Sequence, residues 1–253
     1  MIQKMVTSAL IAGFGAGLLA ALLHFAFVQQ YILLGEQYES GALTHFATAT
    51  APTTAHDHGT DLGTDHMAND TADNAADGHA HSHDDGDAQP LTRNSLTILF
   101  AGLVYVAYAL MLTAGFGLAQ SFGKVITARE GLLWGIAGFA SFQLAPALGL
   151  APELPGTIAA DLTARQIWWW GTALFTGTGL ALLGYGRGYL AWGAAIVLLA
   201  APHIIGAPLP DGYGGVAPPE VAAMFSARVL GVALTVWAVL GWLAGYLWSQ
   251  EKV

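Results

Sequence analysis

The chain has 253 residues, of which 55% are hydrophobic and only 10% are charged. Soluble domains carry roughly one quarter charged residues, so this composition excludes an ordinary water-soluble domain and indicates a membrane protein. The chain contains no cysteine, which excludes disulfides, thiolate metal sites and cysteine nucleophiles. Its formal net charge of −9 makes nucleic acid an unsuitable partner.

Uncharged apolar runs of about 20 residues recur along the chain, each long enough to cross the hydrocarbon core of a bilayer. They predict an all-α fold, a polytopic bundle of transmembrane helices. We expect about six spans, at residues 5–34, 95–120, 131–150, 168–184, 190–209 and 223–248. A five-span alternative stays open, in which the two shortest segments, 168–184 and 190–209, form a partly re-entrant pair. The resulting organisation is a first transmembrane helix (1–35), a polar loop (36–94) and a five-helix transmembrane region (95–253).

The distribution of basic residues predicts the orientation, because short cytoplasmic loops retain Lys and Arg. If both termini are cytoplasmic, five basic residues lie on the cytoplasmic side, namely Lys4, Lys124, Arg129, Arg187 and Lys252. Three lie on the other side, namely Arg93, Arg165 and Arg228. The loop 36–94 is then extracytoplasmic.

Small residues spaced four apart occur inside three of the predicted spans. Examples are Gly13 with Gly17, Gly131 with Gly135, and Gly241 with Gly245. This spacing lets two helix backbones approach closely in lipid. It is explained by packing within one bundle, and a homo-oligomer face is the alternative.

The loop 36–94 is rich in His, Asp, Gly, Ala and Thr and poor in aliphatic residues, so we expect it to be disordered in isolation. It holds seven of the nine histidines: His45, His56, His58, His66, His79, His81 and His83. Imidazoles beside carboxylates suit divalent cobalt, nickel or zinc, and a flexible chain can gather several of them around one ion. The loop therefore predicts metal capture. A solvated acidic linker and a pH sensor are the alternatives.

Ionisable side chains inside lipid are costly, so each one suggests a functional role. His24 lies in the first predicted span and His203 in the fifth, and both fall in the outer half of the membrane in the predicted orientation. Glu153 and Asp161 fall on the same side. We predict that His24, His203, Glu153 and Asp161 contact the metal ion. For each histidine a packing role is the alternative, and for Asp161 the alternative is an ion pair with Arg165 one helical turn later. Pro202, Gly206 and Pro208 predict an interrupted helix near His203.

Three stretches of the chain resemble a known family. They are the first span with His24, the run from Gly149 through Pro152-Glu153-Leu154-Pro155-Gly156 to Trp169, and Pro202-His203-Ile204-Ile205-Gly206-Ala207-Pro208. In these stretches the chain is similar to the CbtA family of predicted cobalt transporters, and the resemblance covers essentially the whole membrane part.

The resemblance implies a bacterial inner-membrane component of cobalt uptake for cobalamin synthesis, with a small single-span, His-containing partner, CbtB. Cobalt is then the expected substrate, with nickel and zinc as alternatives. The rival hypothesis is a membrane assembly or interaction subunit, whose external loop buffers or senses metal without transport. An enzyme is not expected, because the residues offer no nucleophile or acid–base pair that supports one.

Overall fold

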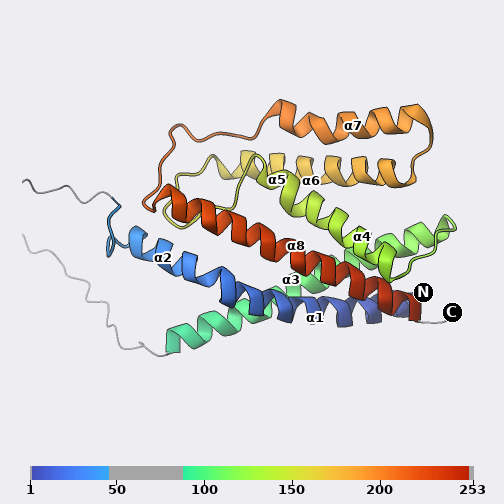
Figure 1. Cartoon of the computed structure of the whole chain (residues 1–253), viewed down its shortest axis with the longest axis horizontal. Coiled ribbons are helices and arrows are strands. Elements are labelled where there is room, and N and C mark those ends of the chain that lie inside the picture. Colours follow the sequence, from blue (N-terminus) through green and yellow to red (C-terminus); the bar gives the residue numbers. More distant parts are fainter. Residues whose placement is uncertain (1, 46–87, 251–253) are drawn as a thin grey trace, which may run out of the picture.

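The computed structural model describes residues 2–45 and 88–250, and the regular elements in this part of the chain are helices (Figure 1). In chain order they are α1 (Ile2–Phe27), α2 (Gln29–Glu39), α3 (Ala88–Ser121), α4 (Ala128–Phe139), the π-helical turn η1 (Ala140–Leu144), α5 (Ala145–Ala147), α6 (Leu162–Tyr185), α7 (Gly188–Ile205) and α8 (Pro219–Gln250). The predicted all-α class is confirmed for these residues.

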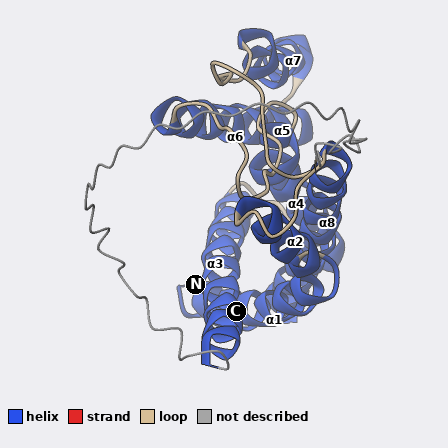
Figure 2. Ribbon diagram, turned by 90° about the vertical axis from the view of Figure 1, so that its left-hand side faces the viewer, coloured by secondary structure: helices blue, strands red, loops and turns tan. Residues whose placement is uncertain are grey.

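The long helices pack in a spatial order that differs from their order in the chain. α3 packs on α1, α1 on α8 and α8 on α4, while α6 packs on η1 and α5 and carries α7 on its other side (Figure 2). α1 begins and α8 ends at the same end of the bundle, where the α3–α4 and α6–α7 connections also lie (Figure 1). The opposite end holds α2 and the two longer connections, 148–161 and 206–218.

Glycines spaced four apart form the seams between helices. A Cβ on Gly131 would lie 2.3 Å from the carbonyl oxygen of Gly241, and a Cβ on Gly135 would lie 2.3 Å from that of Trp237. α4 and α8 are therefore in backbone contact, which alanine at these positions would prevent. Between α1 and α3, a Cβ on Gly17 would meet the Cα of Gly102 at 2.7 Å. The predicted close approach thus occurs within one chain.

The main core lies where α1, α3 and α8 meet, and it reaches η1. α1 contributes a buried alanine face, and the Trp237 side chain of α8 is fully buried. Its indole stacks on the Phe142 ring at 5.9 Å and lies 4.6 Å from the Tyr108 ring, measured between centroids. Aromatic packing therefore fixes η1 against the centre of the bundle.

Four helices in the described residues are long and apolar enough to cross a membrane: Ile2–Phe27, Leu91–Ser121, Gly188–Ile205 and Pro219–Gln250. This number is smaller than the sequence-based expectation of about six. The predicted span 131–150 is divided among α4, η1, α5 and the start of the next connection. The predicted span 168–184 lies inside α6, whose tryptophans, threonines and glycines lower its mean hydropathy. The first predicted span is also divided, because α1 and α2 are separated at Val28.

The connection 148–161 is attached to its neighbours by several polar contacts. The Ser226 hydroxyl of α8 donates to the carbonyl of Pro152 at 2.6 Å. The backbone N–H of Ile158 donates to the carbonyl of Gly214 at 2.9 Å, next to an isolated antiparallel bridge between Thr157 and Gly215. These contacts hold Glu153 in a defined place at this end of the bundle.

Candidate functional site

A cavity of about 560 Å³ lies between α1, α3, α8 and η1, toward the end of the bundle that holds α2. Most of its lining is apolar. Its polar lining comes from five side chains: His24, Arg93, Thr97, Tyr105 and Gln143. A few polar groups converging in an apolar cavity are typical of a small-ligand or ion site.

His24 reaches this cavity from the last turn of α1. The helix ends three residues later, because Val28 interrupts it before α2 begins at Gln29. The imidazole is partly buried and makes an edge contact with the Phe25 ring, with centroids 5.8 Å apart. Within the described residues the ring has no hydrogen-bond partner, so neither of its nitrogens is engaged by this part of the protein. The prediction that His24 contacts the metal ion stays a prediction, and the structure places its ring in the lining of this cavity.

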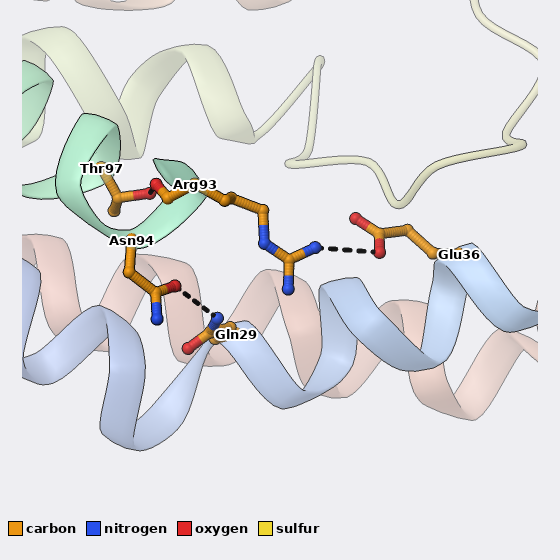
Figure 3. A network of polar contacts seen from close by, with 5 residues as sticks. All are labelled: Gln29, Glu36, Arg93, Asn94 and Thr97. Atoms are coloured by element: carbon orange, nitrogen blue, oxygen red, sulfur yellow. Dashed lines mark hydrogen bonds and ion pairs between the residues drawn. The ribbon is translucent and has the colours of Figure 1, made fainter. Parts of the chain in front are cut away.

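The rim of this cavity is a polar network between α2 and α3 (Figure 3). The Arg93 guanidinium forms an ion pair with the Glu36 carboxylate at 3.3 Å, and the Gln29 amide donates to the Asn94 side-chain oxygen at 3.2 Å. Thr97 donates to the backbone carbonyl of Arg93 at 2.9 Å. Arg93 is therefore both a lining residue of the cavity and a partner in the rim.

Gln143 lies in a stretch where the α-helix is replaced by a π-helical turn. The N–H of Ala145 bonds to the carbonyl of Ala140, five residues earlier, in place of the usual four. Pro146 follows, and because it has no N–H it cannot continue the α-helical hydrogen bonding. Single π-helical turns are frequent at functional sites. This one directs Gln143 toward the cavity, and the sequence signal for it was the proline inside an apolar segment.

A second cavity, of about 360 Å³, lies between η1, the connection 148–161 and the first turns of α6. Its polar lining consists of Gln143, Glu153, Arg165 and Gln166, and Trp169 and Trp170 contribute aromatic walls. Gln143 lines both cavities. The only amide in η1 is thus the residue that the His24 cavity and the Glu153 cavity share.

The charged groups of the second cavity are paired differently from the expectation. Arg165 donates to the Glu153 carboxylate at 2.9 Å. Asp161 is not its partner, because the Asp161 side chain accepts from the backbone N–H of Ala164 at 2.8 Å and so caps the N-terminus of α6. The Asp161–Arg165 ion pair, which was the alternative role for Asp161, is therefore wrong. An N-cap carboxylate turns back toward the free N–H groups of the first turn, and this leaves Arg165 free to reach Glu153.

His203 lies in the last turn of α7, on the same end of the bundle as His24 but outside both cavities. Its ring is exposed and makes an edge contact with the Trp168 ring, with centroids 6.4 Å apart. The carbonyl of Pro202 accepts from the Trp168 indole at 3.2 Å and from the N–H of Gly206 at 3.0 Å. α7 ends here, four residues before the end of the predicted span 190–209, and no helix follows until Pro219. The predicted break near His203 and Gly206 is thus the end of the helix and not a gap between two helical halves.

The four predicted metal contacts outside the His-rich loop are therefore spread over separate places. His24 lines the first cavity, Glu153 the second, Asp161 caps α6 and His203 lies beside Trp168. Within the described ranges 2–45 and 88–250, no group of three or more His, Asp or Glu side chains could hold a metal ion. The remaining predicted contacts, His56, His58, His66, His79, His81 and His83, lie outside the described residues.

A comparison with protein families identifies the kind of protein to which these cavities belong. The family model of the probable cobalt transporter subunit (CbtA) matches residues 2–249. The chain belongs to the CbtA family. This confirms the resemblance that the sequence stretches indicated. CbtA is a family of transporter subunits and not a class of enzymes, and its apolar helices are those of a membrane protein. No curated protein and no solved structure matches the chain significantly.

Proposed function

We propose that this CbtA protein takes up a divalent transition metal, with cobalt as its substrate for cobalamin synthesis, across the bacterial inner membrane. The observation that carries the proposal is the cavity lined by His24, because an imidazole with no hydrogen-bond partner in the described part of the chain can ligate such ions. The family match supports cobalt over nickel and zinc. The predicted partner is a single-span CbtB subunit, and a homo-oligomer is the alternative assembly.

In the proposed topology all six predicted segments cross the membrane. α4, η1 and α5 together form one crossing and α6 forms another, because each runs between the same two ends of the bundle as the four apolar helices (Figure 1). Both termini are cytoplasmic, in agreement with the basic residues at that end. The cavity of His24 then lies in the outer half of the membrane, next to the first turns of α3, which follow the His-rich loop in the chain.

The proposed path begins in the loop, where histidines raise the local concentration of the ion. The ion then exchanges part of its water for the His24 imidazole in the first cavity. Gln143 contacts the remaining water molecules through its amide, and Glu153 offers a carboxylate in the second cavity. The membrane potential drives the movement, with about 2.3 kcal/mol per charge per 100 mV and therefore about twice this for a divalent ion. Asp161 and His203 lie beside this path and not on it.

The rival function is a membrane assembly subunit whose loop buffers or senses metal. One observation favours this rival function. Arg93 lines the first cavity and pairs with Glu36, and Arg165 lines the second cavity and pairs with Glu153. Polar groups that hold each other in this way can serve packing alone.

Uptake into proteoliposomes that contain this chain alone separates the two functions. We expect cobalt to accumulate inside when an inside-negative potential is imposed, with nickel and zinc as weaker competitors. A variant lacking residues 46–87 should take up less cobalt at low metal and the same amount at saturating metal. External binding without accumulation, with or without a potential, would reject transport by this chain and support the assembly subunit.

A further inference from the structure

The rim of the His24 cavity contains a carboxylate that is not required for packing. Glu36 lies on α2, seven residues after the hydrogen-bonded Gln29, and its partner Arg93 comes from the start of α3 (Figure 3). Both side chains are about half exposed, at 44% for Glu36 and 47% for Arg93. Exposed pairs of this kind shift an equilibrium by no more than about fivefold.

Other contacts already hold the two segments together. The Gln29–Asn94 hydrogen bond joins the same segments, and α1 and α3 are in backbone contact at Gly13 and Gly17. The Glu36–Arg93 pair therefore adds little to the fold. Its distinctive feature is its position, because Arg93 lines the cavity of His24 while Glu36 lies just outside.

A guanidinium and a divalent metal ion compete for the same carboxylate oxygens. A divalent ion carries twice the charge, so at equal distance its attraction to the carboxylate is twice as strong. The exposure of Arg93 lets its guanidinium move into water when it is displaced. The arrangement at the rim thus allows one cation to replace another without leaving a buried charge.

We propose that Glu36 is a transfer ligand for the metal ion at the mouth of the His24 cavity, and that Arg93 is the resident cation which the ion displaces. The proposal rests on the proposed uptake function. The ion passes from the loop to Glu36, Arg93 swings away, and the ion continues to His24 while the ion pair forms again. Between transfer events the guanidinium of Arg93 occupies the carboxylate of Glu36.

Opposite effects of two substitutions test this role. In proteoliposomes, Glu36→Gln should raise the cobalt concentration for half-maximal uptake at least fivefold. Arg93→Gln should lower it by a factor of two to about five, because the competing cation is removed. Two control variants, Lys124→Gln and Glu130→Gln, make the same changes of charge at the other end of the bundle. Each should change the cobalt concentration for half-maximal uptake less than twofold. A structural ion pair would instead give shifts of the same sign, or none, and either result in a transporting wild type would overturn the proposal.

A second measurement separates this proposal from the uptake function itself. Phenylglyoxal modifies free guanidinium groups, and mass spectrometry reports the modified positions. Adding cobalt to the full-length wild type in detergent should speed the modification of Arg93 and leave that of Arg129 unchanged. If Arg93 responds while proteoliposomes fail to accumulate cobalt, the uptake function is wrong and Glu36 remains a metal ligand. If Arg93 does not respond to cobalt while uptake proceeds, the displacement is wrong.

Discussion

Replacing Gly241 with alanine tests whether the α4–α8 seam holds this membrane bundle together. The new Cβ would lie 2.3 Å from the carbonyl oxygen of Gly131 and 2.6 Å from the Cα of Gly135. Both are backbone atoms, so no side chain can rotate away. A carbon atom makes its best contacts at about 3.5–4.0 Å, so α4 and α8 must separate by about 1 Å along the seam.

Gly231 provides the matched control, because it lies in the same helix, ten residues earlier, with nothing within 4 Å of its Cβ position. Both substitutions gain the same helix propensity, up to about 1 kcal/mol. Only Gly241→Ala also overfills a packed contact, at a cost of about 1–3 kcal/mol. We therefore expect Gly241→Ala to be the less stable variant by about this amount.

Thermal unfolding in detergent, followed by size-exclusion chromatography of the protein that stays in solution, measures the difference. An overpacking cost of about 1–3 kcal/mol should place the apparent Tm of Gly241→Ala about 3–10 °C below that of Gly231→Ala. Equal apparent Tm values for the two variants would refute the view that backbone contact between α4 and α8 stabilises the fold.

Three further predictions concern the cavities and the residues near them. His24→Ala should reduce cobalt uptake at least tenfold at both low and saturating metal, and His203→Ala should reduce it less, because His203 lies outside both cavities; an equal or larger loss in His203→Ala would contradict the proposed path. Gln143→Leu should abolish most uptake with an unchanged apparent Tm, whereas Gln143→Asn should keep a measurable rate; full uptake in Gln143→Leu would remove the amide from the path. Asp161→Ala should lower stability by about 0.5–2 kcal/mol through loss of the N-cap, while Asp161→Asn should keep both stability and uptake. Loss of uptake in Asp161→Asn with normal stability would mean that the Asp161 carboxylate contacts the ion.

The long apolar runs of the sequence were sufficient to predict the helical class and the positions of most long helices. α3, α7 and α8 each contain the predicted span or nearly all of it, because an apolar run long enough to cross lipid must satisfy its backbone as a helix. The spacing of Gly131, Gly135, Gly241 and Gly245 also indicated close packing, since small residues four apart leave a groove along a helix. Which two grooves meet is a tertiary property, and the sequence alone did not pair α4 with α8.

The sequence did not predict where the helices break. Residues 131–150 are uncharged and mostly apolar, and hydropathy does not distinguish a continuous helix from α4, a π-helical turn and α5. Pro146 was the available signal, but proline within a membrane helix is compatible with a kink as well as with an end. The stacking of Phe142 on Trp237 fixes the π-helical turn, and that contact joins residues almost one hundred positions apart.

The sequence also did not predict which charged side chains pair, and this pairing bears on the mechanism. Arg165 had a carboxylate one turn away at Asp161, yet it pairs with Glu153, which the Ser226 contact at Pro152 holds within reach. Arg93 pairs with Glu36 across the whole polar loop. On the proposed path, His24, Gln143 and Glu153 would each present a single ligand group, in adjoining cavities, to an ion that keeps some of its water. Ion conduction requires sites that bind strongly enough for entry and weakly enough for release, and single donors arranged in series meet that requirement better than one complete coordination shell would.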